Sequence, residues 1–401
     1  MAATIRYSAL KPASGSYWLI LAVLAVLSVV GLLSAHHMDV EGHHISGMNN
    51  EIVWGLPHVC AIFLIVAASG ALNVASMSSV FGRSAYKPLA RLSALMAIAL
   101  LTGGLAILVL DLGRPDRLII AMTTYNFKSI FAWNVLLYVG FIGVVAVYLW
   151  LMMERRMVVY SKAAGVTALV WRLILTTGTG SIFGFLIARE TFDSALLAPM
   201  FIVMSFAFGL AVFVIILLLA CTLDNRILDD SMVERLRKLL GLFCSAILYF
   251  VLVFHATKLY GTQFHGAEAF VLRDGGLYTS LFWIGHVGLG VIVPMALAFL
   301  PAFENSRKAL IAASTLVVLG ALAQLYAFII GGQAYPLNIF PGYEVSSSFV
   351  DGVVADYGPS IWEIALGVGG MAVAVLITLL VCRVLPVFPD RIDAAESPTA
   401  D

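Results

Sequence analysis

The chain has 401 residues, of which 61% are hydrophobic and only 11% charged, with 23 basic and 23 acidic side chains. So little charge and a mean hydropathy of +1.00 exclude a soluble globular domain. The zero net charge and the absence of a basic tract give no sign of a nucleic-acid partner.

Ten hydrophobic segments are long enough to cross a bilayer as helices, which takes ~20 residues. In chain order they cover about residues 17–35, 52–75, 92–110, 129–152, 164–188, 197–220, 239–260, 278–300, 309–331 and 361–382. We therefore predict an all-α polytopic membrane protein with about ten transmembrane helices. The first segment is too long for the apolar region of a signal peptide and lacks a good cleavage site, so we expect an uncleaved anchor helix.

The basic residues are distributed unequally between alternate connections. Sixteen lie on the side of the N-terminus, six lie on the opposite side, and Arg172 falls inside a segment. Because loops rich in Lys and Arg stay in the cytoplasm, we expect both termini to be cytoplasmic. The connection 221–238 has the charge pattern of an amphipathic interfacial helix.

The first outer connection contains the sequence HHMDVEGHH at residues 36–44. Imidazole and carboxylate groups at this density are typical of zinc or copper sites. The stretch has no HxxxH spacing, however, and adjacent histidines on a loop more often contact solvent, lipid headgroups or a partner. We expect no metal here, and the four scattered cysteines form no CxxC motif for zinc or an iron–sulfur cluster.

Polar side chains inside the membrane are the best indicators of function, because an ionisable group there costs at least ~2.5–3.5 kcal/mol. Most of them are expected in the outer half of the membrane. They are His58, Asp111, Arg114, Asn134, Tyr138, Arg189, Glu190, His255, Lys258, His286, Gln324, Tyr326 and Glu363. A polar cavity near the outer face would suit a lipid-soluble quinol, which must release two protons together with two electrons.

Several of these residues also have a purely structural interpretation. Asp111 could pair with the arginines that follow it, and Arg172 could be a hydrogen-bond hub instead of part of a proton path. Trp54 and Trp133 are typical of aromatic anchors at the membrane surface. His255 and its neighbouring lysine could simply extend to the interface.

Three stretches share their pattern with a known family. They are NNEIVWGLPHVCAIFLIVAASGALNVAS at 49–76, LVLDLGRPDRLIIAM at 108–122 and NFKSIFAWNVLLY at 126–138. These stretches resemble the NrfD family of quinone-reactive membrane subunits, which includes the membrane subunit of polysulfide reductase. Within the family, the resemblance is greatest to the DsrP group, the membrane subunits of DsrMKJOP complexes in sulfur-metabolising bacteria.

The resemblance implies NrfD-like helix bundles over residues 52–331. An anchor helix and the histidine-rich loop (1–51) would precede this core, and an outer loop, a last helix and a cytoplasmic tail (332–401) would follow it. It also implies a quinone, either menaquinone or ubiquinone, near the outer face, with no haem or iron–sulfur cluster in this chain.

The resemblance implies partners as well. A periplasmic iron–sulfur subunit would exchange electrons with the quinone, beside other membrane and cytochrome subunits of a Dsr-type complex in the bacterial inner membrane. The chain would then be one membrane subunit of a respiratory sulfur-metabolism oxidoreductase, not catalytic alone. Some family members are also proposed to translocate protons.

The candidate site residues come from the family pattern and from depth in the membrane. In polysulfide reductase the quinone ligands are an Asn and a His early in the first core helix and a Tyr in the fourth. His58 matches the family histidine, whereas the Asn and Tyr have no direct counterpart. The quinone-binding candidates are therefore His58, Asn134, Tyr138, His286 and Glu363. The expected catalytic groups are His58, Asp111 and Tyr138, and the proton-path candidates are Arg172 and Asp111.

Two other functions remain as alternatives. A di-haem cytochrome b needs two histidines per haem on facing helices at matched depth, and the membrane histidines allow one haem at most. A secondary transporter needs inverted repeats and spans broken near the midplane. Pro294 and the stretch TGTGSIFG at 177–184 are the only hints of such breaks, so the quinone interpretation ranks first.

Overall fold

The computed structural model describes residues 5–11, 15–337 and 352–389. Within these ranges the chain is mostly helical, and one pair of two-residue strands, β1 (Tyr7–Ser8) and β2 (Phe388–Pro389), joins its two ends. Ten helical segments of this described part are long and apolar enough to cross a membrane. The predicted all-α polytopic fold is therefore confirmed.

The spanning helices follow the predicted order, with ends that differ by a few residues. They are α1 (Gly15–Glu41), α2 (Leu56–Ala71) with α3 (Asn73–Ser79), α4 (Ala90–Leu110), α6 (Ile130–Met153), α7 (Ser161–Gly184), α8 (Leu197–Leu223), α9 (Asp230–Tyr260), η7 (Leu281–Ile292) with α12 (Val293–Phe299), α13 (Arg307–Ala334) and α14 (Ile361–Val384). Short helices and turns in the connections are η1 (His43–Ile45), η2 (Ser84–Leu89), η3 (Pro115–Arg117), α5 (Leu118–Thr123), η4 (Val158–Tyr160), η5 (Thr262–Phe264), α10 (His265–Ala269), η6 (Phe270–Asp274), α11 (Leu277–Ser280) and η8 (Pro301–Phe303).

The predicted interfacial helix at 221–238 is wrong. Asp229 caps α9, which then runs without a break from this charged stretch into the membrane span. Arg237 is buried among protein groups: it pairs with Glu234 at 2.7 Å and donates to the backbone oxygen of Leu297 at 2.9 Å. Because Arg237 finds its partners inside the protein, the helix can continue through this position into the membrane span.

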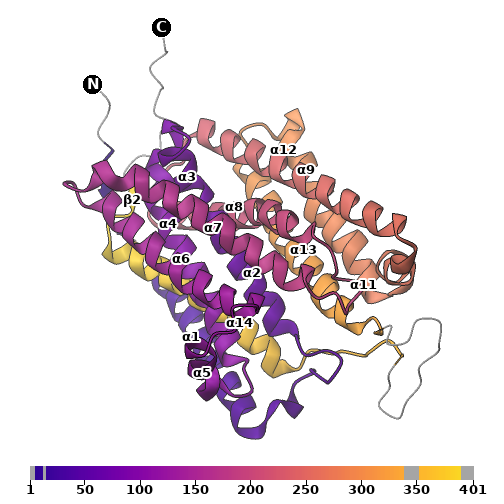
Figure 1. Cartoon of the computed structure of the whole chain (residues 1–401). Coiled ribbons are helices and arrows are strands. Elements are labelled where there is room, and N and C mark those ends of the chain that lie inside the picture. The colour runs from indigo at the N-terminus through magenta and orange to yellow at the C-terminus, as the bar shows by residue number, and fades with distance from the viewer. Residues whose placement is uncertain (1–4, 12–14, 338–351, 390–401) are drawn as a thin grey trace.

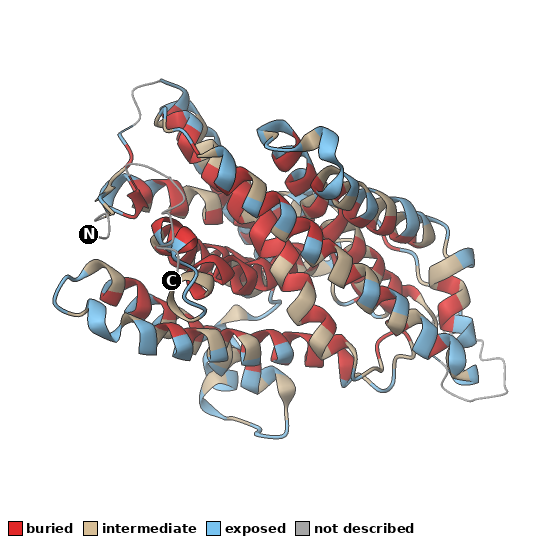
Figure 2. Cartoon of the chain, turned by 90° about the horizontal axis from the view of Figure 1, so that it is seen from above, coloured by how far each residue is buried: buried red, intermediate tan, exposed pale blue. Residues whose placement is uncertain are grey.

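The helices form two groups that meet at α2 and α8 (Figure 1). The first group contains α2, α4, α6 and α7, and the second contains α8, α9, η7 with α12, and α13. The helix α14 covers α2 and α4, and α1 packs on the outside of α14. The sequence of α2 is apolar on every side, as expected for a helix surrounded by protein, and its hydrophobic window is entirely buried. Figure 2 shows this buried centre among half-exposed outer helices.

Small residues allow the closest helix crossings. Gly70 of α2 faces Gly209 of α8 so closely that an added Cβ at Gly70 would collide with the backbone oxygen of Ser205. A similar glycine pair, Gly31 and Gly369, joins α1 to α14. Close backbone approach of this kind is a main source of helix association in membranes, where lipid tails compete with apolar side chains.

The two ends of the described chain lie on the same side of the molecule (Figure 1). Ten crossings return the chain to its starting side, and β1 pairs with β2 there. Arg226 supports this contact by donating to Ser8 Oγ at 2.9 Å and to the backbone oxygen of Pro389. We call this the terminal side and the opposite end of the helices the far side.

The Gly70–Gly209 crossing gives a first prediction. The variant Gly70→Ala should lower the free energy of unfolding by about 1–3 kcal/mol, because a backbone oxygen and not a flexible side chain occupies the space. Thermal unfolding of the purified chain measures the effect. The matched control is Gly143→Ala, where an added Cβ meets nothing within 4 Å. Equal melting temperatures for the two variants would contradict the proposed tight crossing.

Candidate functional site

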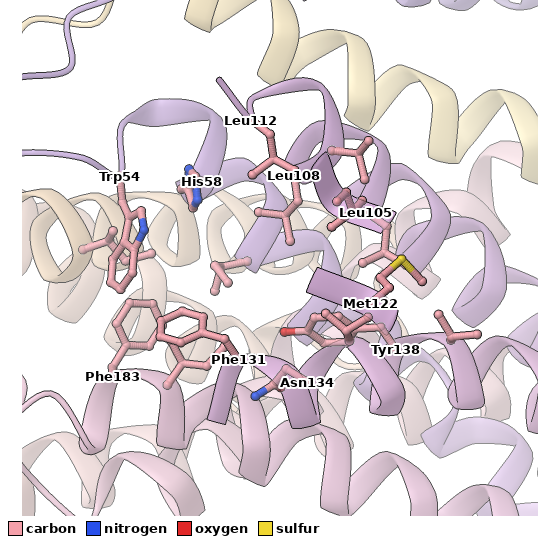
Figure 3. A pocket seen from close by; sticks show the side chains of 17 residues that line it. Trp54, His58, Leu105, Leu108, Leu112, Met122, Phe131, Asn134, Tyr138 and Phe183 are labelled. Carbon is pink, nitrogen blue, oxygen red and sulfur yellow. The ribbon is translucent and has the colours of Figure 1, made fainter. Parts of the chain in front are cut away.

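A cavity of about 360 Å³ lies in the first helix group (Figure 3). Two of its lining residues belong to α5, which lies on the far side (Figure 1). The walls of the cavity come from α2, α4, α5, α6 and α7, with one residue from α13. Most of the lining side chains are aliphatic or aromatic, and the strongly polar ones are His58, Asn134 and Tyr138. A mostly apolar cavity with a few polar groups is typical of small-molecule sites, which measure roughly 300–1,000 Å³.

His58 and Asp111 form the polar centre of one wall. His58 lies in the first turn of α2, where Pro57, the second residue of the helix, favours helix initiation. Asp111 ends α4, and its Oδ2 lies 3.0 Å from His58 Nδ1. Because a carboxylate can only accept here, Nδ1 of a neutral imidazole carries the hydrogen and Nε2 is left as an acceptor. The side chain of Asp111 is only 1% exposed and that of His58 is 22% exposed.

The alternative pairing of Asp111 with the following arginines is wrong. Arg114 pairs with Asp116 at 3.0 Å, and both side chains are exposed. Asp111 instead receives a second contact at its backbone oxygen, 3.1 Å from His43 Nε2. Its Oδ1 is buried and has no hydrogen-bond partner among the described residues, so this carboxylate keeps an unused acceptor.

Asn134 and Tyr138 lie one turn apart on α6, across the cavity from His58 (Figure 3). The amide of Asn134 donates to the backbone oxygen of Gly178 at 3.1 Å, while its Oδ1 has no partner in the described chain. The Tyr138 hydroxyl lies 3.4 Å from Thr179 Oγ1, whose own hydrogen goes to a backbone oxygen at 3.0 Å. Tyr138 is therefore the donor, and this long contact leaves its hydroxyl available to a ligand.

Aromatic side chains that were not predicted as site residues complete the cavity. Trp54 stacks on His58 with ring centroids 6.1 Å apart. It also packs edge-to-face against Phe183, with ring centroids 5.6 Å apart. It therefore lines the cavity, although its position favoured a membrane-surface anchor. Phe131 on α6 lies opposite, 6.2 Å from Trp54. In the sequence, the position of Trp54 four residues before His58 is a signal that could have linked the indole to this site.

The short helix α5 forms the outer edge of the cavity. Leu118 and Met122 point into it and belong to its lining. The residues between them, Ile119 and Ile120, are 62% and 58% exposed. A short helix with apolar side chains on both surfaces separates the cavity from the surroundings of the protein.

His286 and Glu363 do not line this cavity. His286 lies in η7 of the second helix group, where it is buried and its Nε2 has no partner among described residues. Glu363 starts α14 and is fully buried. Its carboxylate accepts hydrogen bonds from Gly47 N at 2.7 Å, Ser360 N at 2.8 Å and the Tyr357 hydroxyl at 2.8 Å. Both residues therefore lie outside the cavity that contains His58.

Arg172 is buried between helices. Its guanidinium donates to the backbone oxygen of Ser69 on α2 at 3.2 Å and lies 5.3 Å from the ring centroid of Phe206. Its Nε has no partner in the described chain. These contacts join α7 to α2 and α8, as the hydrogen-bond interpretation expected.

The histidine-rich stretch divides between two elements. His36 and His37 belong to the last turns of α1, and His37 packs on Trp362 with ring centroids 4.3 Å apart. His43 and His44 belong to η1. In the part of the chain that the structure describes, no group of three or more His, Cys, Asp or Glu side chains is placed to hold a metal.

A second histidine–carboxylate pair lies in the second helix group. His255 Nδ1 is 2.6 Å from Glu268 Oε2, beside a cavity of about 40 Å³. Lys258 is 2% exposed and donates to the backbone oxygen of Glu190. Both basic residues are therefore paired inside the protein and do not extend to the interface. Glu268 lies in a connection and was not predicted.

Comparison with known proteins identifies the family. The family described as "Polysulphide reductase, NrfD" matches residues 44–336, most of the chain. The chain therefore belongs to the NrfD family, which agrees with the resemblance seen in the sequence. The match begins after α1 and ends before α14, so these two helices lie outside it.

Several curated relatives extend over most of the chain. The chain is 27% identical to the "Hdr-like menaquinol oxidoreductase integral membrane subunit" of Archaeoglobus fulgidus, covering 96% of this chain and 98% of the relative. It is 30% identical to a putative membrane subunit of the dimethyl sulfoxide reductase of Halobacterium salinarum, covering 95% and 93%. It is 25% identical to one polypeptide of the polysulfide reductase of Wolinella succinogenes, covering 71% and 96%.

The His58–Asp111 pair gives a second prediction. The variant Asp111→Ala should lower the free energy of unfolding by about 1–3 kcal/mol, because it removes a buried carboxylate and leaves Nδ1 of the partly buried His58 without its acceptor. Thermal unfolding checks this expectation. The control Asp116→Ala removes an exposed carboxylate from the same turn and should leave the melting temperature nearly unchanged. A larger loss in the control would contradict the assignment.

Proposed function

We propose that this chain is the quinone-reactive membrane subunit of a respiratory oxidoreductase complex. In this proposal the quinone ring occupies the 360 Å³ cavity, and His58 exchanges a proton with it. The observation that carries the proposal is the pairing of His58 with the buried Asp111 on one wall of an apolar cavity, with Asn134 and Tyr138 on the other. The name of the Archaeoglobus relative as a menaquinol oxidoreductase subunit supports it.

The residues of the cavity fit a quinone ring. The ring is flat and carries oxygens at opposite ends, so it needs a polar group on each of two facing walls. His58 Nε2 can accept from a quinol hydroxyl. Tyr138 can donate to a quinone oxygen when its hydroxyl hydrogen turns away from the long, 3.4 Å contact with Thr179. The unpartnered Oδ1 of Asn134 is a further acceptor. Trp54, with its aromatic neighbours, provides apolar surfaces on which a ring can stack.

The chemistry of the quinone is reversible transfer of two electrons and two protons. During quinol oxidation His58 accepts a proton at Nε2, and the Asp111 carboxylate stabilises the resulting imidazolium through Nδ1–H. His58 then releases this proton toward the far side before it accepts the second one. In the opposite direction His58 donates the same protons to the quinone.

The apolar edge of the cavity supports access from the lipid. Ile119 and Ile120 of α5 are exposed, whereas Leu118 and Met122 line the cavity. In a bilayer the exposed side would contact acyl chains. We infer that the ring and its hydrophobic tail pass beside α5, which would keep the reacting groups out of bulk water.

The proposed location rests on the orientation that the basic residues indicate, and the proposed partners rest on the family resemblance. With both termini cytoplasmic, the far side faces the periplasm of a bacterial inner membrane. Electrons would pass there to a periplasmic iron–sulfur subunit, beside other membrane and cytochrome subunits of a Dsr-type sulfur-metabolism complex. The Wolinella relative is named as part of a polysulfide reductase, which supports the sulfur assignment. Menaquinone is favoured over ubiquinone by the name of the Archaeoglobus relative.

Proton translocation is the further part of this proposal. Asp111 has an unused buried oxygen next to His58, and Arg172 lies deeper, between α7 and α2. These two residues are the candidates for a path between the cavity and the interior of the protein.

The proposal predicts saturable binding of a quinol analogue. We would titrate the full chain in nanodiscs with the fluorescent analogue heptyl-hydroxyquinoline N-oxide and follow the quenching of its fluorescence. The variant His58→Ala should weaken binding at least about ten-fold. It removes the hydrogen bond between Nε2 and the analogue and leaves the buried Asp111 carboxylate without the partner that holds this wall of the cavity in place. The control His44→Ala, in the exposed part of η1, should bind like wild type. Absence of saturable binding in wild type would refute a quinone site in this chain.

The opposite wall predicts a smaller, selective effect. The variant Tyr138→Phe should weaken binding of the analogue about three- to ten-fold, the usual contribution of one hydrogen bond. Tyr148→Phe is the matched control, because this tyrosine lies on the same helix and its hydroxyl bonds to Ser79 Oγ at 2.6 Å, away from the cavity. Equal affinities for the two variants would exclude Tyr138 as a ligand.

A further inference from the structure

The two helices outside the family match contact the segments that lead into the site. The α1 helix is followed by η1, whose His43 bonds to the backbone oxygen of Asp111. The segment before α14 contains Tyr357, which is 7% exposed. Both segments lie on the far side, next to the start of α2. Neither contributes a side chain to the lining of the cavity.

Tyr357 makes two short hydrogen bonds. Its hydroxyl accepts from the backbone N–H of Leu56, the first residue of α2, at 2.7 Å. It donates to Glu363 Oε1 at 2.8 Å. The first N–H groups of a helix have no partner inside the helix, so an outside acceptor at this position fixes where the helix begins.

Glu363 extends this link to the residues before α2. Its Oε2 accepts from Gly47 N at 2.7 Å and from Ser360 N at 2.8 Å, which completes the capping box of α14. The carboxylate thus lies close to the N-termini of both α14 and α2. Helix N-termini carry partial positive charge, which stabilises a buried anion there.

The close approach depends on a glycine. An added Cβ at Gly55 would collide with Glu363 Oε1 and approach the Tyr357 hydroxyl within 2.7 Å. The backbone of α2 therefore starts directly against this pair. Burial and the negative charge of Glu363 both raise the pKa of Tyr357, so its phenol keeps its hydrogen at physiological pH and remains the donor.

We propose that Tyr357 is a positioning residue for His58: it holds the first turn of α2 so that the imidazole meets Asp111. Leu56 and His58 lie in the same helical turn, and a hydrogen bond of 3.0 Å to Asp111 tolerates little displacement. Asp111, the partner of His58, is held in turn by His43, whose Nε2 contacts the backbone oxygen of Asp111. The functional consequence rests on the quinone function proposed above.

The first test does not depend on quinone. In the full chain labelled with nitrogen-15 histidine, the His58 imidazole signals are assigned by their absence in His58→Ala. The variant Tyr357→Phe should shift these signals or broaden them, because the first turn of α2 loses its acceptor. The matched control is Tyr326→Phe, which removes a hydroxyl from a ring whose centroid lies 6.2 Å from that of Tyr357. Unchanged His58 signals in Tyr357→Phe would overturn the proposal.

The second test measures coupling to His58. Binding of heptyl-hydroxyquinoline N-oxide should weaken about ten-fold in Tyr357→Phe, with no further loss when the change is added to His58→Ala. If the losses of the two single variants add fully in the double variant, Tyr357 affects binding independently of His58, for example through a general loosening of the fold. That result would overturn the proposal. If Tyr357→Phe fails to fold, Glu363→Gln keeps the size and an acceptor oxygen, and it should move the same His58 signals to a smaller extent.

The two proposals fail in different ways. Shifted His58 signals without saturable binding in wild type would support the positioning role and refute the quinone site. Saturable binding that depends on His58 but is equal in Tyr357→Phe and Tyr326→Phe would support the quinone site and refute the positioning role.

Discussion

The hydrogen bond between His58 and Asp111 is the contact on which the site depends. A carboxylate that is 1% exposed at the end of a membrane helix must find its partner inside the protein, because lipid offers none. The bond joins the start of α2 to the end of α4. It therefore holds two walls of the cavity together, while α6 and α7 close the other side. The same bond leaves Nε2 of His58 as an acceptor, so one contact serves both the fold and the proposed chemistry.

Much of the fold could be predicted because the bilayer imposes simple rules. Length and hydropathy were sufficient for all ten spans, since a helix must satisfy its own backbone in lipid. The cost of burying ionisable groups directed attention to His58 and Asp111, and depth alone added Asn134 and Tyr138. The interfacial helix at 221–238 failed for a physical reason. Charges such as Arg237 were paired inside the protein, and helix α9 could therefore extend through them.

The rest depends on which helices are neighbours, and depth does not determine that. His286 and Glu363 were chosen from their expected depth, yet they lie in the second helix group and at the start of α14. The structural alternative placed Asp111 beside the arginines of its own turn, whereas its partner is 53 positions away in sequence. Trp54 was assigned to the membrane surface for the same reason: its cavity exists only once α2, α6 and α7 are packed together.

The second helix group shows that a histidine–carboxylate pair does not by itself make a binding site. His255 and Glu268 are closer together, at 2.6 Å, than His58 and Asp111, at 3.0 Å, but their cavity has about 40 Å³ against about 360 Å³. A volume of that size admits about one water molecule and no ring. The two pairs thus differ in the space beside them, which α5 and the aromatic walls of the first group create. Space next to an accepting imidazole is therefore the feature that favours His58 as the proposed reacting group.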